Sequence, residues 1–137
     1  MIVADTSAML ALLDADDRHH DAVRELWEAD PDSWVLPWSI LPELDYLVRR
    51  QLGVRTVQLF LQDVAVRAYH IEYGMPVDMM RACELAAQYR GMELGLVDAV
   101  VMAVAERLRA SAIATLDLKH FAAVELRTAP RLLPRDA

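Results

Sequence analysis

The sequence contains a single cysteine, Cys83, and therefore no pair that could form an internal disulfide. This residue lies in the helical pattern MMRACELAAQY, where we expect a small buried side chain. Lysine is scarce as well, because all but one of the 14 basic residues are arginine. The longest uncharged runs, WVLPWSILP and AVVMAVA, are far too short to cross a bilayer, and no basic segment precedes the apolar start as in a secretory signal. We expect a soluble, cytoplasmic protein in a reducing compartment, with no membrane contact.

Acidic residues outnumber basic ones, which gives a formal net charge of −7. This balance argues against a protein that holds nucleic acid through many lysine and arginine contacts. An enzyme that binds a phosphodiester through metal ions needs fewer basic residues, because the cation neutralises the carboxylates that bind it. The preference for arginine favours bidentate phosphate recognition or reflects genome composition, and the sequence leaves both explanations open.

Apolar periodicity predicts strands that alternate with helices, without repeats or a linker. A length of 137 residues with 55% apolar content suits one compact domain covering residues 1–137. The alternation indicates an α/β protein, a three-layer α/β/α sandwich in which helices cover both faces of a central, mainly parallel sheet. The expected strands are 1–4, 34–36, 68–71, 112–116 and an edge strand at 124–128, and the expected helices are 6–14, 18–29, 40–52, 54–64, 76–91 and 98–110.

Four acidic residues fall where this alternation brings carboxylates to one edge of the sheet. Asp5 and Asp117 follow the strand-like runs MIVA and AIATL, while Glu43 and Asp98 lie in the opening turns of helices. Ligands of open α/β sheets bind beyond the carboxyl ends of the strands, which is the edge these positions reach. Carboxylates gathered without partners repel one another unless a hard cation binds them. The four residues therefore predict a metal-dependent phosphodiesterase, with helix capping by Asp5 or Asp98 and a helix-dipole role for Glu43 as the simpler alternatives.

Glu43 and Asp45 cannot both belong to this cluster. Two helical steps rotate a side chain by roughly 200°, so only one of the two faces the site. Either the cluster takes Glu43, which leaves Asp45 in solvent or paired with arginine, or the reverse holds.

Hydroxyl groups stand close to the predicted carboxylates. Thr6 and Ser7 directly follow Asp5 and can donate to a carboxylate or a phosphate. Thr115 precedes Asp117 by two residues and can do the same, although a β-branched residue in a strand needs no such role. These three residues are candidates for supporting the site.

The segments VADTSAML, LPELDYL, GLVDAVVMAVAERL and TLDLKHF, taken together, resemble the signature blocks of PIN-domain ribonucleases, in particular the VapC-type toxins of bacterial toxin–antitoxin pairs. The blocks occur in the order and at the spacing of that family and span nearly the whole chain. The resemblance implies a PIN-like sandwich and a Mg²⁺ or Mn²⁺ site formed by four acids. It also implies endonucleolytic cleavage of RNA by water, which leaves 5′-phosphate ends, a homodimer, and silencing by a small antitoxin. In the family's pattern the glutamate aligns with Glu43, and the remaining acids align with Asp5, Asp98 and Asp117.

The main alternative is a PIN-fold module that binds RNA or a protein without catalysis. The complete set of acids argues against it, because a degenerate member is expected to lose a carboxylate first. A phosphatase of the haloacid-dehalogenase type would need a second acid two residues after Asp5, where Ser7 stands. The adjacent His19 and His20 diverge by about 100° on a helix and do not form a two-ligand metal face. Side chains that could contact RNA, but that more commonly pack in a core or an interface, are His120, Trp27, Trp34, Trp38 and Phe60.

Overall fold

The computed structural model describes residues 1–137 and contains one sheet of five parallel strands in the order β3-β2-β1-β4-β5. This sheet confirms the predicted α/β class, and it is wholly rather than mainly parallel. The central strand is β1, which pairs with β2 on one side and β4 on the other. The strands are β1 (Ile2–Ala4), β2 (Trp34–Pro37), β3 (His70–Glu72), β4 (Ala112–Ala114) and β5 (Arg131–Leu133).

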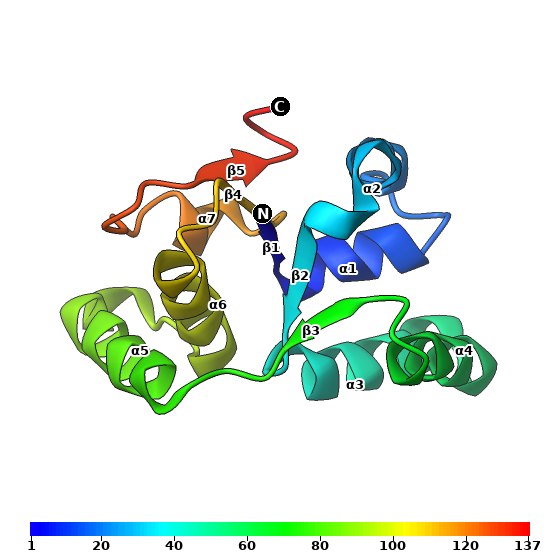
Figure 1. Ribbon diagram of the computed structural model, residues 1–137, viewed down its shortest axis with the longest axis horizontal. Coiled ribbons are helices and arrows are strands. Elements are labelled where there is room, and N and C mark those ends of the chain that lie inside the picture. Colours follow the sequence, from blue (N-terminus) through cyan, green and yellow to red (C-terminus); the bar gives the residue numbers. More distant parts are fainter.

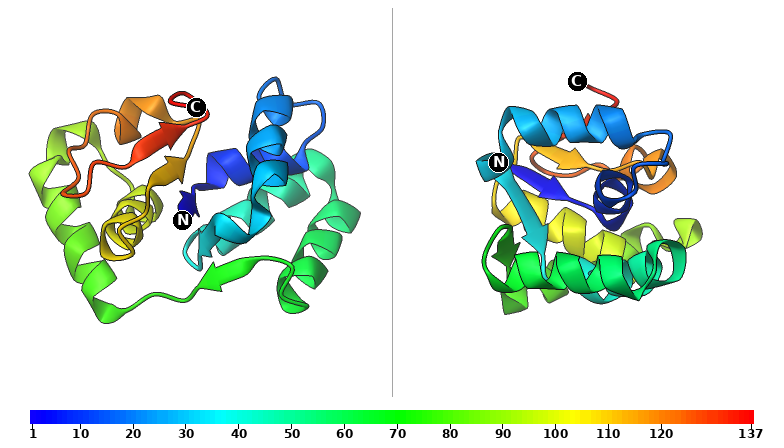
Figure 2. Two further views of the ribbon diagram at one scale, coloured as in Figure 1. Left: turned by 45° about the horizontal axis from the view of Figure 1, so that its top comes forward. Right: turned by 90° about the vertical axis from the view of Figure 1, so that its right-hand side faces the viewer.

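Helices form a layer on each face of the sheet (Figure 1). On one side α6 packs against β1 and β2 and is backed by α5, while α1 to α4 occupy the other side, where α3 packs against β2 (Figure 2). None of the helices is long and apolar enough to span a membrane. The helices are α1 (Thr6–Leu13), α2 (His20–Ala29), α3 (Ile40–Leu52), α4 (Val54–Ala65), α5 (Pro76–Gln88), α6 (Leu96–Arg107) and α7 (Leu118–Phe121), with short 3-10 turns η1 (Pro31–Ser33) and η2 (Arg90–Met92).

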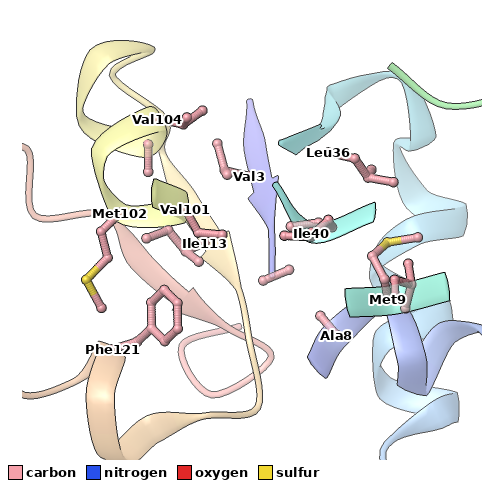
Figure 3. Close-up of a cluster of buried hydrophobic side chains, with 14 of the residues drawn as sticks. Val3, Ala8, Met9, Leu36, Ile40, Val101, Met102, Val104, Ile113 and Phe121 are labelled. Carbon is pink, nitrogen blue, oxygen red and sulfur yellow. The ribbon is translucent and has the colours of Figure 1, made fainter. Parts of the chain in front are cut away.

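The core fills the space between the sheet and both helix layers. Val3 and Ile113 of the central strands are fully buried, and Val101 and Met102 of α6 are buried beside them (Figure 3). On the opposite face Met9 belongs to the same cluster. Helix α6 is buried over most of its surface, as its apolar sequence predicts, and this fixes its amino end at the carboxyl edge of the sheet.

Two predictions about local structure are wrong. The edge strand expected at 124–128 does not form, and β5 lies instead at 131–133, where the Arg131 N–H donates to the carbonyl of Ser111. Parallel pairing explains the difference, since after α7 the chain must return to the amino end of β4 before a parallel strand can begin. Cys83, expected to be buried, is exposed on α5.

Ion pairs hold α5 against α6 and link α6 to the end of β3. Arg107 contacts the buried Asp78 at 2.7 Å and Glu72 at 2.8 Å. Arg81 contacts Glu106 at 2.7 Å. In each pair a carboxylate that loses solvent on folding gains a guanidinium partner, as burial of charge requires.

Candidate metal centre

Asp5 lies at the carboxyl end of the central strand and is almost completely buried, with 3% of its surface exposed. It is the N-cap residue of α1, but its side chain makes no capping hydrogen bond. Its Oδ2 instead accepts hydrogen bonds of 2.9 Å from Ser7 and from Thr115. Its Oδ1 is buried without any hydrogen-bond partner. Burial raises the pKa of this carboxyl, against the lowering effect of the two hydroxyls.

The hydroxyls that hold Asp5 are themselves fixed by the backbone after β4. Ser7 Oγ accepts from the N–H of Leu116 at 2.9 Å, and Thr115 Oγ1 accepts from the N–H of Asp117 at 3.1 Å. Because an ionised carboxylate only accepts hydrogen bonds, each hydroxyl donates its own hydrogen to Asp5. The hydroxyl of Thr6 is not part of this network, since its buried Oγ1 has no hydrogen-bond partner, whereas the backbone of Thr6 helps to lower the pKa of Asp5.

Asp98 stands in the first turn of α6, two residues after the first helical residue, so it is not the N-cap; that position belongs to Gly95. Burial, followed by the negative charges of Asp5 and Asp117, raises the pKa of the Asp98 carboxyl to about 6. The charge of Glu43 acts in the same direction on both Asp5 and Asp98. Asp98 therefore lies close enough to each of the other three predicted carboxylates to be repelled by it.

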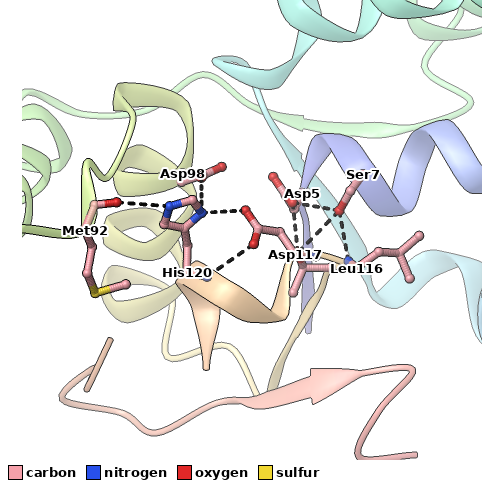
Figure 4. A network of polar contacts seen from close by, with 8 residues as sticks. Asp5, Ser7, Met92, Asp98, Leu116, Asp117 and His120 are labelled. Atoms are coloured by element: carbon pink, nitrogen blue, oxygen red, sulfur yellow. Dashed lines mark hydrogen bonds and ion pairs between the residues drawn. The ribbon is translucent and has the colours of Figure 1, made fainter. Parts of the chain in front are cut away.

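Asp117 follows β4 and caps the short helix α7. Its Oδ1 accepts from the backbone N–H of His120 at 3.2 Å, and its Oδ2 lies 2.8 Å from Nδ1 of the same histidine (Figure 4). From the sequence, His120 is expected only as a side chain that could contact RNA. Its spacing of three residues from a strand-end aspartate is the signal that could have placed it in the cluster, because such pairs meet in a first helical turn.

Glu43 and Asp45 point in different directions, as the helical rotation requires. Glu43 is exposed, and its charge acts on the cluster, whereas Asp45 forms a 3.1 Å ion pair with Arg49 one turn along α3. The alternative that left Asp45 paired with arginine is therefore the one the structure adopts.

No arginine or lysine neutralises the four carboxylates. His120 is the only ion-pair partner of Asp98 and Asp117, and no ion pair involves Asp5 or Glu43. Buried Asp78 shows the contrast, since Arg107 satisfies it fully. A buried carboxylate oxygen without a partner, surrounded by other carboxylates, fits a divalent cation that prefers oxygen ligands.

The aromatic residues divide between core and surface. Trp34 and Phe60 are buried, and Trp27 packs against Trp34 with ring centroids 5.4 Å apart. Trp38 is half exposed just after β2 and packs against the exposed Tyr73 at 5.3 Å. Among the four aromatic candidates, Trp38 therefore has the most surface available to a partner.

Comparison with known sequences agrees with this geometry. The family model described as PIN domain matches residues 2–126. The chain is 32% identical over 123 residues to Ribonuclease VapC26 of Mycobacterium tuberculosis strain H37Rv, which covers 90% of this chain and 91% of the relative.

Solved structures share the fold. The crystal structure of Mycobacterium tuberculosis VapC20, a Sarcin-Ricin loop cleaving toxin, matches with a TM-score of 0.72 and 25% identity over 82% of this chain and 87% of that chain. The crystal structure of FitAcB from Neisseria gonorrhoeae matches with a TM-score of 0.65 over 96% of each chain, and at 16% identity it is evidence for the fold alone.

Proposed function

This chain belongs to the PIN-domain family, and we propose that it is a single-domain, metal-dependent endoribonuclease that acts as the toxin of a toxin–antitoxin pair. One observation supports the proposal: Asp98 lies beside Asp117 and within range of the charges of Asp5 and Glu43, its only basic partner is His120, and the buried Oδ1 of Asp5 has no hydrogen-bond partner. The relatives named as a ribonuclease and as a loop-cleaving toxin support RNA as the substrate.

Asp5 and Asp98 would hold a Mg²⁺ or Mn²⁺ ion, with Glu43 and Asp117 as further oxygen ligands there or at a second ion. When bound, such an ion supplies a water of lowered pKa and offsets the charge that develops on the phosphate. This chemistry leaves a 5′-phosphate and a 3′-hydroxyl, since water rather than the ribose hydroxyl attacks.

The protein's own part is to keep these oxygens in position before the substrate arrives. Ser7 and Thr115 direct their hydrogens at Asp5 Oδ2, so that the other oxygen is left for the cation. The start of the buried helix α6 fixes Asp98, and the turn into α7 fixes Asp117. Preorganised ligands of this kind avoid reorganisation during the reaction.

The direct test is cleavage of a mixed RNA pool by the purified chain. We expect cleavage with millimolar Mn²⁺ or Mg²⁺ and none with EDTA, and sequencing of the new 5′ ends should show 5′-phosphates. Binding of RNA without metal-dependent cleavage would instead establish the alternative of a non-catalytic PIN-fold module.

Glu43 and Asp45 provide a matched pair for the same assay, because they lie two residues apart on one helix. Glu43→Gln should slow cleavage about tenfold or more, since it removes a charge that acts on Asp5 and Asp98. Asp45→Asn should stay within about twofold of the wild type, because it removes only a surface ion pair with Arg49. The reverse result would show that the wrong face of α3 has been assigned to the site.

A small antitoxin is the partner that this function requires. We propose that it lays an apolar segment across the site and directs an arginine at the carboxylates. The unneutralised acids are complementary to such a guanidinium, which can bind a carboxylate in a bidentate manner.

We also propose that the chain forms a homodimer through the exposed apolar side chains around the Trp38–Tyr73 pair. A groove of about 530 Å³ is lined there by both rings, Met79 and Leu96, and all four side chains are at least half exposed. Exposed apolar surface of this extent commonly marks an interface.

Light scattering should therefore give a dimer for the wild type and a monomer for Met79→Glu. Val66→Glu introduces the same charge at an exposed residue after α4, outside the groove, and should remain a dimer. A monomeric wild type at every accessible concentration would refute the dimer.

A further inference from the structure

His120 lies beside the carboxylate cluster with one ring nitrogen turned toward two of its members. Its Nδ1 is 2.8 Å from Asp117 Oδ2 and 3.8 Å from Asp98 Oδ2 (Figure 4). One donor atom from each of these three residues lies within 4.8 Å of the others. Donors that share one cation, each about 2.1 Å from it, are separated by about 3 to 4 Å, so the 2.8 and 3.8 Å distances of Nδ1 are close to the spacing that a common ion requires.

The contact made by the second ring nitrogen, Nε2, leaves Nδ1 as the nitrogen that can bind a metal ion. Nε2 of His120 is 3.2 Å from the backbone carbonyl oxygen of Met92. A carbonyl oxygen only accepts hydrogen bonds, so Nε2 carries a hydrogen. Nδ1 also carries one while it donates to the Asp117 carboxylate, and a cation that displaces this hydrogen meets the lone pair of the neutral ring at Nδ1. Histidines that bind metals commonly donate their other N–H to a backbone carbonyl in this way, which fixes both tautomer and ring orientation.

The fold holds the ring in this position without help from a ligand. His120 belongs to α7, whose cap is Asp117 and whose next residue, Phe121, is buried in the core. Met92 belongs to η2, which precedes α6 and Asp98. The ring is therefore held between the two segments that carry its neighbouring carboxylates, and its side chain is only 20% exposed.

Building on the proposed function, we infer that His120 Nδ1 binds the catalytic cation directly, together with Asp98 and Asp117. The site then has a mixed nitrogen and oxygen donor set rather than a purely carboxylate one. Because Mg²⁺ strongly prefers oxygen while Mn²⁺ binds imidazole more readily, this set selects Mn²⁺ over Mg²⁺.

A different role for His120 would be to hold Asp117 by a hydrogen bond without touching the cation. The two roles differ in whether a ring nitrogen is bound to the ion. Pulsed electron paramagnetic resonance of bound Mn²⁺ detects that bond, because the nuclear spin of a coordinated nitrogen couples to the electron spin of the ion.

The experiment compares two samples of Mn²⁺-loaded wild-type protein, one in which the histidines contain ¹⁴N and one in which they are labelled with ¹⁵N. We expect a coordinated ¹⁴N signal that is replaced by ¹⁵N on labelling. His120→Gln should lose the signal, and His70→Gln, which changes an exposed histidine on β3, should keep it. The isotope comparison requires no substitution, so a folding defect in a variant would not affect it.

Calorimetry supplies the independent measurement. His120→Gln should weaken Mn²⁺ binding about tenfold or more and Mg²⁺ binding much less, so the ratio of the two affinities falls. Mn²⁺ bound by the wild type without a coordinated nitrogen would overturn the role of His120 and leave the proposed nuclease standing. Failure of the wild type to bind Mn²⁺ at all would overturn both.

Discussion

Replacing Asp5 by asparagine should lower metal-dependent RNA cleavage at least about a thousandfold without unfolding the protein, a loss of roughly 4 kcal/mol of transition-state stabilisation. The carboxylate is almost fully buried, and its Oδ1 is the one oxygen in the cluster that is buried with no hydrogen-bond partner. An uncharged amide cannot neutralise a bound cation, and its nitrogen cannot ligate one.

The orientation of the new side chain makes the substitution severe. Ser7 and Thr115 both donate a hydrogen to Oδ2, and a backbone N–H occupies one acceptor position of each hydroxyl. The amide oxygen of Asp5→Asn therefore takes that position. Its NH₂ group then occupies the position of Oδ1 and presents hydrogens to the place where the cation would bind.

Asp45→Asn is the control for this measurement, since it makes the same chemical change outside the cluster. Thermal melts in EDTA should show that Asp5→Asn is at least as stable as the wild type. Burial raises the pKa of the Asp5 carboxyl, which means that its charged form is unfavourable in the folded protein, and the substitution removes that charge. Cleavage by Asp5→Asn within tenfold of the wild-type rate would mean that the free oxygen of Asp5 has no part in catalysis.

The placement of Asp5, Glu43 and Asp117 near enough to act on the charge of Asp98 could be predicted from the sequence because it depends on topology, while their role as metal ligands stays a prediction. Asp5 follows the central strand β1 and Asp117 follows its neighbour β4, while Asp98 lies in the first turn of a helix too apolar to lie anywhere but in the core. The rotation of a helix, which the sequence also contains, predicts that only one of Glu43 and Asp45 faces the site, and the choice of Glu43 rests on the family resemblance. Such features are set by short-range geometry.

The role of His120 and the position of β5 were not predictable in the same way. His120 depends on the carbonyl of Met92, 28 residues away in sequence, and no local pattern encodes that contact. The segment 124–128 has the alternation of a strand, yet it is the return path to the amino end of β4. Exposure of Cys83 likewise depends on which face of α5 meets α6, since a short helix with apolar residues on several sides leaves that choice to tertiary packing.

Asp98→Asn should remove most of the stabilisation that Mn²⁺ gives while leaving the metal-free protein as stable as the wild type or more so. A cation that binds only the folded state at about a hundred times its dissociation constant adds roughly 3 kcal/mol, or on the order of 10 °C in melting temperature. The wild type should show this shift between EDTA and millimolar Mn²⁺. The variant should show little of it, because a ligand has been lost.

The pH dependence in EDTA identifies the cause. The pKa of Asp98 is about 6 in the folded protein and 3.8 in the unfolded chain. Below about pH 4 the carboxyl is protonated in both states, so wild type and Asp98→Asn should be equally stable. As the pH rises from 4 through 6, only the unfolded chain ionises freely, and the wild type should lose about 1 to 2 kcal/mol relative to the variant once solvent screening is allowed for.

Asp78 is the matched control, because it occupies the same position in the first turn of α5 that Asp98 occupies in α6. Arg107 pairs with Asp78, so Asp78→Asn should destabilise the protein and leave the Mn²⁺ shift intact. If Asp98 served only the dipole of α6, Asp98→Asn would be less stable than the wild type at pH 8, by about 0.3 to 1 kcal/mol, and would keep the full metal shift. The sign of the change at pH 8 therefore separates a metal ligand from a helix-stabilising charge, and an unchanged shift would remove Asp98 from the centre.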